Sequence, residues 1–307
     1  MTTLLLQHPA FLAHAAPLGH PERPDRVRVV DRILEHERFQ DLAREGAPVG
    51  TAEMVLRVHP MNHYSFIEKL TPRQGLRSLD DDTTLSPGSF EAAMRAVGAS
   101  TRAVDEVMTG KVQNAFCAIR PPGHHAETSK AMGFCFFNNA AVAARHAQAV
   151  YGAERVAIVD FDVHHGNGTQ QIFWNDPSVL YASTHQMPLF PHTGEKSETG
   201  AGNIFNAPLT AGDDGSVFQE AMETRILPAL DNFRPDLLII SAGFDAHHRD
   251  PLGELKFTEA DFAWATRKLM DVAERSCNGR VVSVMEGGYD LEGLARSVAA
   301  HVMTLMS

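Results

Sequence analysis

The chain has 307 residues, of which 44% are hydrophobic, and its formal net charge is -11 at pH 7. This length and composition fit a single α/β domain over residues 1–307 with a large buried core, and no shift in composition marks a linker. The negative charge and the lack of a lysine or arginine cluster argue against direct nucleic-acid binding, which requires neutralisation of phosphates.

The N-terminal segment 1–9 contains an apolar run that is too short for a signal peptide, and no stretch is long enough to cross a membrane. We therefore expect a cytoplasmic protein without a membrane partner, and a homo-oligomer is compatible with the sequence. Cys117, Cys135 and Cys277 lack metal-binding spacing and do not indicate disulfides.

Segments with helical apolar spacing alternate with strand-like apolar runs along the chain. Thr258, followed three residues later by Asp261, is typical of a capping box at a helix N-terminus. Strands that alternate with helices predict a mostly parallel sheet with helices on both faces. The helical spacing covers residues 25–38, 87–109, 138–150, 214–230, 258–275 and 290–305.

Two histidines follow the apolar run 115–119, in the loop Arg120-Pro121-Pro122-Gly123-His124-His125. The two prolines and the glycine define a tight turn, so this loop holds both imidazoles in fixed places. A single loop histidine is more often structural, but a fixed pair is suited to general acid and base catalysis.

The segment 155–159 predicts a buried parallel strand, and Asp160, Asp162 and His164 come next. Alternate residues of an extended chain share a face, so these three side chains are expected to point the same way. Carboxylate and imidazole ligands suit zinc, whose catalytic sites combine three protein ligands with one open position. The alternatives are a helix cap formed by the aspartates and a satisfied polar rim formed by the histidine pair.

Two further apolar strands also end in polar loops. Residues 236–240 lead to Ser241-Ala242-Gly243-Phe244-Asp245, and residues 280–285 lead to Glu286-Gly287-Gly288-Tyr289. A phenol at this turn could donate a hydrogen bond to an oxyanion, although glycine turns before an aromatic residue are common in loops. Open parallel sheets place their sites beyond the carboxyl ends of strands, so the four loops predict an active site at one edge of the sheet.

Together these segments resemble the zinc-dependent histone deacetylase superfamily, in an order and spacing that cover almost the entire chain. Asn167 and the segment His20–Arg26 resemble the class II type and the bacterial histone deacetylase-like amidohydrolases. The resemblance implies the arginase-deacetylase arrangement of a single α/β domain. The segments that carry it are 121–125, 133–139, 160–170, 241–245 and 286–289.

The resemblance implies that Asp162, His164 and Asp245 bind one Zn²⁺ ion per chain. Asp160, a ligand on the strand-alternation argument, would instead orient a histidine near a site for a structural K⁺ ion, and His165 would lie off the metal face. The residues implied to surround the ligands, or to hold the monovalent ion, are Asp160, Asn167 and Ser183.

The resemblance also implies a mechanism in which zinc activates water for attack on an amide. His125 would take the water proton and return it to the leaving amine, with His124 as its electrostatic partner. Tyr289 would donate a hydrogen bond to the oxyanion. Because Asn167 gives His125 an amide neighbour in place of a carboxylate, the pKa of His125 is expected to be lower than in class I sites.

A narrow substrate channel is implied as well, with Phe134 and Phe190 as its walls, Gly133 beside them and Leu252 at the rim. Core packing is the alternative for Phe190. The polyamine-selective relative has a glutamate at the rim position, so a leucine favours acyl-lysine or neutral amide substrates. An acid among residues 80–82 could supply the missing charge instead.

The implied activity is zinc-dependent hydrolysis of acyl-amides, with an acylated lysine or another acylated amine as the substrate. An acetylpolyamine amidohydrolase of the same fold is the alternative, and a weakly active protein that binds acyl-lysine is disfavoured because every catalytic position is filled. By resemblance Arg23 would contact an inner product-release cavity, and a surface salt bridge is its simpler role.

Overall fold

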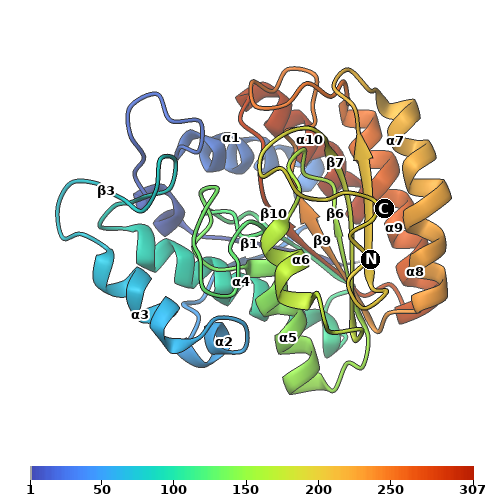
Figure 1. Ribbon diagram of the computed structural model, residues 1–307, viewed down its shortest axis with the longest axis horizontal. Coiled ribbons are helices and arrows are strands. Elements are labelled where there is room, and N and C mark those ends of the chain that lie inside the picture. The colour runs from blue at the N-terminus through green and yellow to red at the C-terminus, as the bar shows by residue number, and fades with distance from the viewer. Residues whose placement is uncertain (1) are drawn as a thin grey trace.

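The computed structural model describes residues 2–307, which fold around one eight-stranded sheet (Figure 1). The strand order is β2-β1-β5-β10-β9-β6-β7-β8, and every neighbouring pair is parallel, so the prediction of a mostly parallel sheet is confirmed. A small antiparallel hairpin, β3-β4, lies apart from this sheet. The strands are β1 Thr3–Gln7, β2 Ala43–Gly46, β3 Arg77–Ser78, β4 Thr84–Leu85, β5 Asn114–Cys117, β6 Val156–Asp160, β7 Val179–Gln186, β8 Ile204–Leu209, β9 Leu237–Ala242 and β10 Val281–Met285.

Helices cover both faces of the sheet (Figure 1). Helices α4 and α5 pack against each other and against one face, while α9 and α10 form a second pair on the other face, with α1 beside α10. The α-helices are α1 Asp25–Leu34, α2 Ala52–Leu56, α3 Met61–Leu70, α4 Ser89–Met108, α5 Asn139–Tyr151, α6 Asn167–Phe173, α7 Gly215–Ala221, α8 Leu227–Phe233, α9 Glu259–Cys277 and α10 Leu291–Leu305.

The four strands predicted from apolar runs occupy the middle of the sheet as β5, β10, β9 and β6. All their residues are buried, because helices cover both sides of a parallel sheet. Since these strands are direct neighbours and run the same way, the loops after their carboxyl ends meet at one edge of the sheet. This arrangement brings the predicted functional loops together.

Most predicted helices have the expected bounds, and two differ. The helix predicted over 25–38 ends at Leu34, because His36 is extended and a separate 3-10 turn follows at Glu37–Phe39. The segment 214–230 forms α7, a π-helical turn at Met222–Ile226 and then α8. Pro228 in the first turn of α8 lacks the N–H that a continuous α-helix requires, so the regular ladder is interrupted there.

The capping box predicted at the start of α9 is present, since the carboxylate of Asp261 accepts the backbone N–H of Thr258 at 2.8 Å. The apolar run near the N-terminus, considered only as a possible leader, is β1. The edge strands β2 and β8, together with β7, α2, α3 and α6, were not predicted, because their short or mixed patterns carry weak periodicity.

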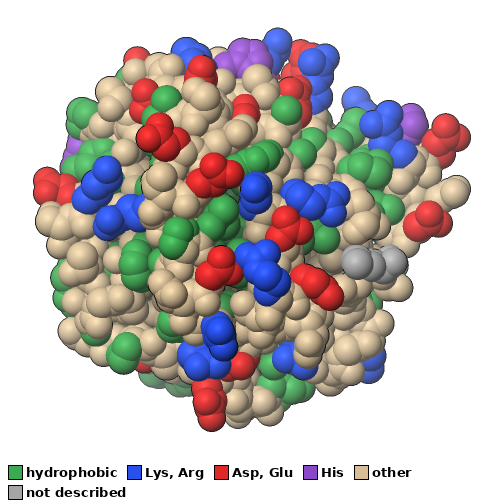
Figure 2. All heavy atoms as spheres, turned by 90° about the vertical axis from the view of Figure 1, so that its right-hand side faces the viewer, with side chains coloured by type: hydrophobic (Ala, Val, Ile, Leu, Met, Phe, Trp, Pro, Cys, Tyr) green, Lys and Arg blue, Asp and Glu red, His purple; other side chains and the backbone are tan. Residues whose placement is uncertain are grey.

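Cys117, Cys135 and Cys277 are buried and unpaired, as expected. No helix within residues 2–307 is both long and apolar enough to traverse a bilayer. On the face shown in Figure 2, basic and acidic side chains are interspersed and do not form a continuous basic patch.

Candidate active site

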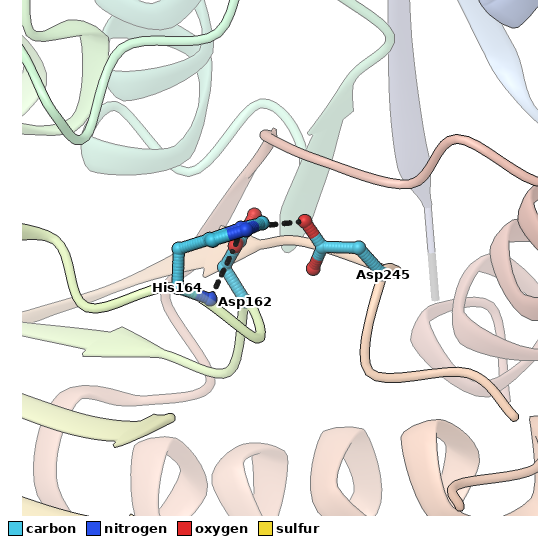
Figure 3. A group of neighbouring side chains, drawn as sticks. All are labelled: Asp162, His164 and Asp245. Atoms are coloured by element: carbon cyan, nitrogen blue, oxygen red, sulfur yellow. Dashed lines mark hydrogen bonds and ion pairs between the residues drawn. The ribbon is translucent and has the colours of Figure 1, made fainter. Parts of the chain in front are cut away.

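Two carboxylates and one imidazole meet beyond the carboxyl ends of β6 and β9 (Figure 3). His164 Nδ1 lies 3.1 Å from Asp162 Oδ1 and 3.2 Å from Asp245 Oδ2. All three residues are buried, and their potential ligand atoms lie within 4.8 Å of one another. The structure therefore brings together the three residues that the resemblance implied as metal ligands.

The argument from strand alternation was wrong for Asp160. Strand β6 ends at this residue, so the alternation does not continue to Asp162 and His164. The Asp160 carboxylate instead accepts hydrogen bonds from His124 Nδ1 at 2.9 Å and from the Tyr181 hydroxyl at 3.0 Å. Asp160 is therefore not part of the three-residue cluster, and its hydrogen bond orients the imidazole of His124.

The two other residues expected around the ligands lie in different places. Ser183 is opposite Asp160 in the β6-β7 register, and its hydroxyl lies 2.8 Å from His185 Nδ1. Asn167 lies beside the imidazole pair instead. His165 is buried away from the carboxylates, with Nδ1 2.7 Å from the Thr193 hydroxyl.

The residues present fit a zinc ion, because two carboxylates and one imidazole form a common catalytic donor set. Two glycines allow the loops to approach the carboxylates closely. A Cβ atom at Gly243 would lie 2.0 Å from Asp162 Oδ2, and one at Gly287 would lie 2.1 Å from Asp245 Oδ2. The Gly287 N–H also donates to Asp162 Oδ2 at 2.8 Å, which fixes one oxygen of this carboxylate.

The imidazole pair lies next to this group, with ring centroids of His124 and His125 4.0 Å apart. The loop that carries them is held by Glu286, whose carboxylate accepts the N–H groups of Gly123 at 2.6 Å and His124 at 3.1 Å. Asn167 Oδ1 lies 2.8 Å from His125 Nδ1, so the predicted amide neighbour is in place.

The two imidazoles differ in their electrostatic surroundings. Burial disfavours a charge on His124, but the carboxylates of Asp162 and Asp160 outweigh it and hold the pKa of His124 well above its usual value. Burial, with His124 and His164 nearby, holds the pKa of His125 well below its usual value. A neutral His125 can accept a proton, and it is thus suited to act as a base.

Tyr289 enters the site from the loop after β10. Its ring packs edge-on against Phe134, with centroids 5.8 Å apart, and the guanidinium of Arg26 lies 4.9 Å from its centroid. Burial raises the pKa of the Tyr289 phenol well above 10. The phenol therefore keeps its proton at neutral pH and remains a hydrogen-bond donor.

A pocket of about 270 Å³ opens onto these groups. The predicted channel residues Gly133, Phe134, Phe190 and Leu252 all contribute to its wall. His125 and Phe190 pack edge to face, with ring centroids 5.1 Å apart. The residues that line the pocket are Asp82, His125, Gly133, Phe134, His164, Leu189, Phe190, Leu252 and Tyr289.

The comparison with known proteins agrees with this geometry. Residues 20–305 match the sequence profile of the histone deacetylase domain. The chain belongs to the histone deacetylase family. Membership places it among deacetylases and amidohydrolases, which are enzymes that hydrolyse amides.

Two relatives of this histone deacetylase family member match it along most of their own length. A probable deacetylase of Archaeoglobus fulgidus is 39% identical over 303 residues, covering 95% of this chain and 83% of the relative. The histone deacetylase-like amidohydrolase of Pseudomonas aeruginosa is 40% identical over 280 residues, covering 89% of this chain and 73% of the relative. The crystal structure of the HDA15 HD domain superposes with a TM-score of 0.94 at 36% identity, covering 99% of this chain and 89% of that one.

Several residues that support the site of this histone deacetylase family member were not predicted. Arg23 is exposed and pairs with Asp25 at 3.6 Å, so its simpler role as a surface salt bridge is confirmed. Arg26, three positions later, is buried and donates through Nε to the Gly288 carbonyl at 2.6 Å. Arg26 lies on the same face of α1 as the buried residues Val30 and Leu34. Its helical spacing from these apolar residues was the signal that could have distinguished it from Arg23. The other supporting residues that were missed are Glu22, Arg120, Asp250 and Glu286.

Proposed function

We propose that the chain is a zinc-dependent deacylase that acts on N-ε-acyl-lysine or related acyl-amines. The observation that carries this proposal is the pocket, whose wall includes His125, His164 and Tyr289 as well as two phenylalanines. A largely apolar pocket that includes a base, a phenol and a residue of the metal-binding group suits an aliphatic stem that carries an amide at its end.

Asp162, His164 and Asp245 would hold the zinc ion. When bound, zinc supplies a Lewis acid that polarises an amide carbonyl and lowers the pKa of water. His125, kept neutral by its buried position, accepts the proton of the attacking water and returns it to the leaving amine. His124 stays charged between two carboxylates and stabilises negative charge nearby.

Tyr289 donates its phenol proton in a hydrogen bond to the oxyanion that forms on the former carbonyl. Because burial keeps the phenol protonated, this donor is available across the neutral pH range. The products of the reaction are a free amine and a carboxylic acid.

The pocket mouth supports acyl-lysine as the substrate class and also leaves a second candidate. Leu252 lines the pocket and carries no charge, which favours a neutral stem. Asp82 lines the same pocket, and its carboxylate can attract a cationic group or accept an N–H of the substrate. An acetylpolyamine, which is cationic, is therefore the alternative substrate.

The proposal is tested by the turnover of zinc-loaded protein on a matched panel of acetyl-lysine peptide, trifluoroacetyl-lysine, acetylputrescine and acetylspermidine. Chelated protein and Tyr289→Phe serve as controls. Turnover of the lysine substrates that is lost in both controls supports the proposal. A preference for acetylpolyamines supports the alternative. Absence of turnover on the whole panel would contradict both and favour a protein that only binds acylated partners.

A further inference from the structure

His20 connects the loop before α1 to two segments that line the pocket, those of Asp82 and Phe134. This half-buried residue lies in the loop before α1, and its Nε2 atom is 3.0 Å from the backbone carbonyl oxygen of Asp82. Its ring packs edge-on against Phe134, with centroids 4.8 Å apart. Its Nδ1 atom lies 3.1 Å from the Glu22 backbone nitrogen. The His20 side chain thus contacts both Asp82 and Phe134, which line the same pocket.

The hydrogen-bond partners of His20 define the role of one ring nitrogen. A carbonyl oxygen only accepts, so Nε2 carries the proton that is donated to Asp82. Nδ1 lies 3.1 Å from the backbone nitrogen of Glu22 and 3.2 Å from its carbonyl oxygen, so this side of the ring is held by Glu22 alone.

Asp82 is held from its other side by its own loop. Its backbone N–H donates to Asp80 Oδ1 at 3.1 Å, and its carboxylate accepts the Thr83 hydroxyl at 2.7 Å. Thr83 Oγ1 in turn accepts the Phe134 N–H at 3.2 Å. The acid and the aromatic wall therefore form one connected unit, and His20 attaches this unit to the loop before α1.

We propose that His20 is a positioning residue that determines affinity for substrates extending beyond the acyl-amine stem. By holding the Asp82 carbonyl, it aims the Asp82 carboxylate at the mouth, where it accepts N–H groups of a peptide that flanks the acylated lysine. A minimal acyl-amine ends before it reaches this carboxylate and gains nothing from it. This inference rests on the proposed function, because it concerns the same pocket.

Three variants separate the hydrogen bond from ring packing. His20→Gln keeps an N–H donor near the position of Nε2, whereas His20→Phe keeps a ring against Phe134 and removes both hydrogen bonds. The matched control is His36→Phe. His36 is an exposed histidine that also accepts a backbone N–H two residues along, from Arg38 at 3.3 Å, and it is not among the residues that line the pocket.

The measurement is kcat and KM on an acetyl-lysine peptide and on N-acetylbutylamine. In His20→Phe we expect KM for the peptide to rise about tenfold with kcat unchanged, as the loss of one positioned hydrogen bond predicts, and KM for N-acetylbutylamine to stay constant. His20→Gln should restore the peptide KM. An equal rise in KM on both substrates would overturn the inference. So would a peptide KM that is normal in His20→Phe but raised in His20→Gln.

Calorimetric binding of the peptide to zinc-loaded Tyr289→Phe protein provides a readout that does not depend on turnover. If the protein hydrolyses nothing but binds the peptide, the proposed function fails. The inference is then supported by about tenfold weaker binding in a second variant that also carries His20→Phe. Unchanged binding in that double variant, or no binding by either protein, overturns it.

Discussion

The carboxylate of Asp250 accepts a hydrogen bond from the backbone N–H of Tyr289 at 2.6 Å. The same oxygen accepts the N–H of Asp290 at 3.2 Å, and the other oxygen accepts the N–H of Leu252 at 3.0 Å. One buried carboxylate of the loop after β9 therefore fixes both the phenol-bearing loop after β10 and the part of the pocket wall formed by Leu252. Its two oxygens hold three backbone donors in place.

Asp250→Asn is expected to lower turnover about tenfold and to destabilise the fold by roughly 1–3 kcal/mol, because an amide replaces one acceptor oxygen with a donor and leaves a buried N–H unsatisfied. Steady-state kinetics and urea unfolding measure the two effects. Asp41→Asn, a change at an exposed aspartate, is the control. Wild-type stability in Asp250→Asn would contradict the role given to this carboxylate.

Tyr289→Phe should lower kcat by roughly a hundred- to a thousandfold, the effect of losing one oxyanion donor. Its zinc content should equal that of the wild type, because Tyr289 is not one of the three clustered metal-ligand candidates. Metal analysis together with kinetics checks both points. Unchanged turnover with full zinc content would remove the phenol from the mechanism.

Leu252→Glu should shift specificity toward acetylspermidine. A carboxylate added at the mouth attracts a cationic chain, and an exposed ion pair of up to about 1 kcal/mol corresponds to about a fivefold gain in kcat/KM relative to the acetyl-lysine peptide. Leu252→Gln has a similar shape without the charge and serves as the control. Equal shifts in both variants would show that charge at this position does not set specificity.

Because of the buried His301, we expect the protein to be less stable to unfolding in acid. Burial lowers the pKa of His301 to about 3, compared with 6.5 for the unfolded chain. Its ring nitrogens lie 2.6 Å from the Thr266 hydroxyl and 2.8 Å from the Ser283 hydroxyl. Above pH 6.5 the residue is neutral in both states and contributes no pH dependence. Between pH 6.5 and 3 the unfolded chain binds a proton that the native protein does not. The free energy of unfolding therefore decreases as the pH is lowered through this range.

The loss due to His301 is about 1.4 kcal/mol for each pH unit below 6.5. Urea unfolding at pH 7 and pH 5.5 should show a steeper decline in the wild type than in His301→Gln, which does not titrate. The comparison uses the change between the two pH values, because the substitution also alters stability at neutral pH. His36→Gln, at an exposed histidine, should retain the wild-type decline, and an equal decline in His301→Gln would refute the prediction.

The local sequence was sufficient to predict the middle of the sheet and the loops that meet at the pocket. Apolar runs before Asp160 and His124 predict buried parallel strands, and such strands must end at a common edge. The alternation of side chains failed at Asp160, because a strand's end depends on its hydrogen-bonded neighbours and not on its own residues.

The chain by itself predicted which residues form the carboxylate and imidazole group and the pocket wall, because residue type and spacing decide what a loop can bind. Only the tertiary structure decided that Arg26, not Arg23, is buried beside Tyr289, and that Asp82 lines the same pocket as Leu252. It also decided that Asp250 holds the phenol-bearing loop. These contacts join segments far apart in the chain, and packing sets their geometry, which local periodicity does not encode.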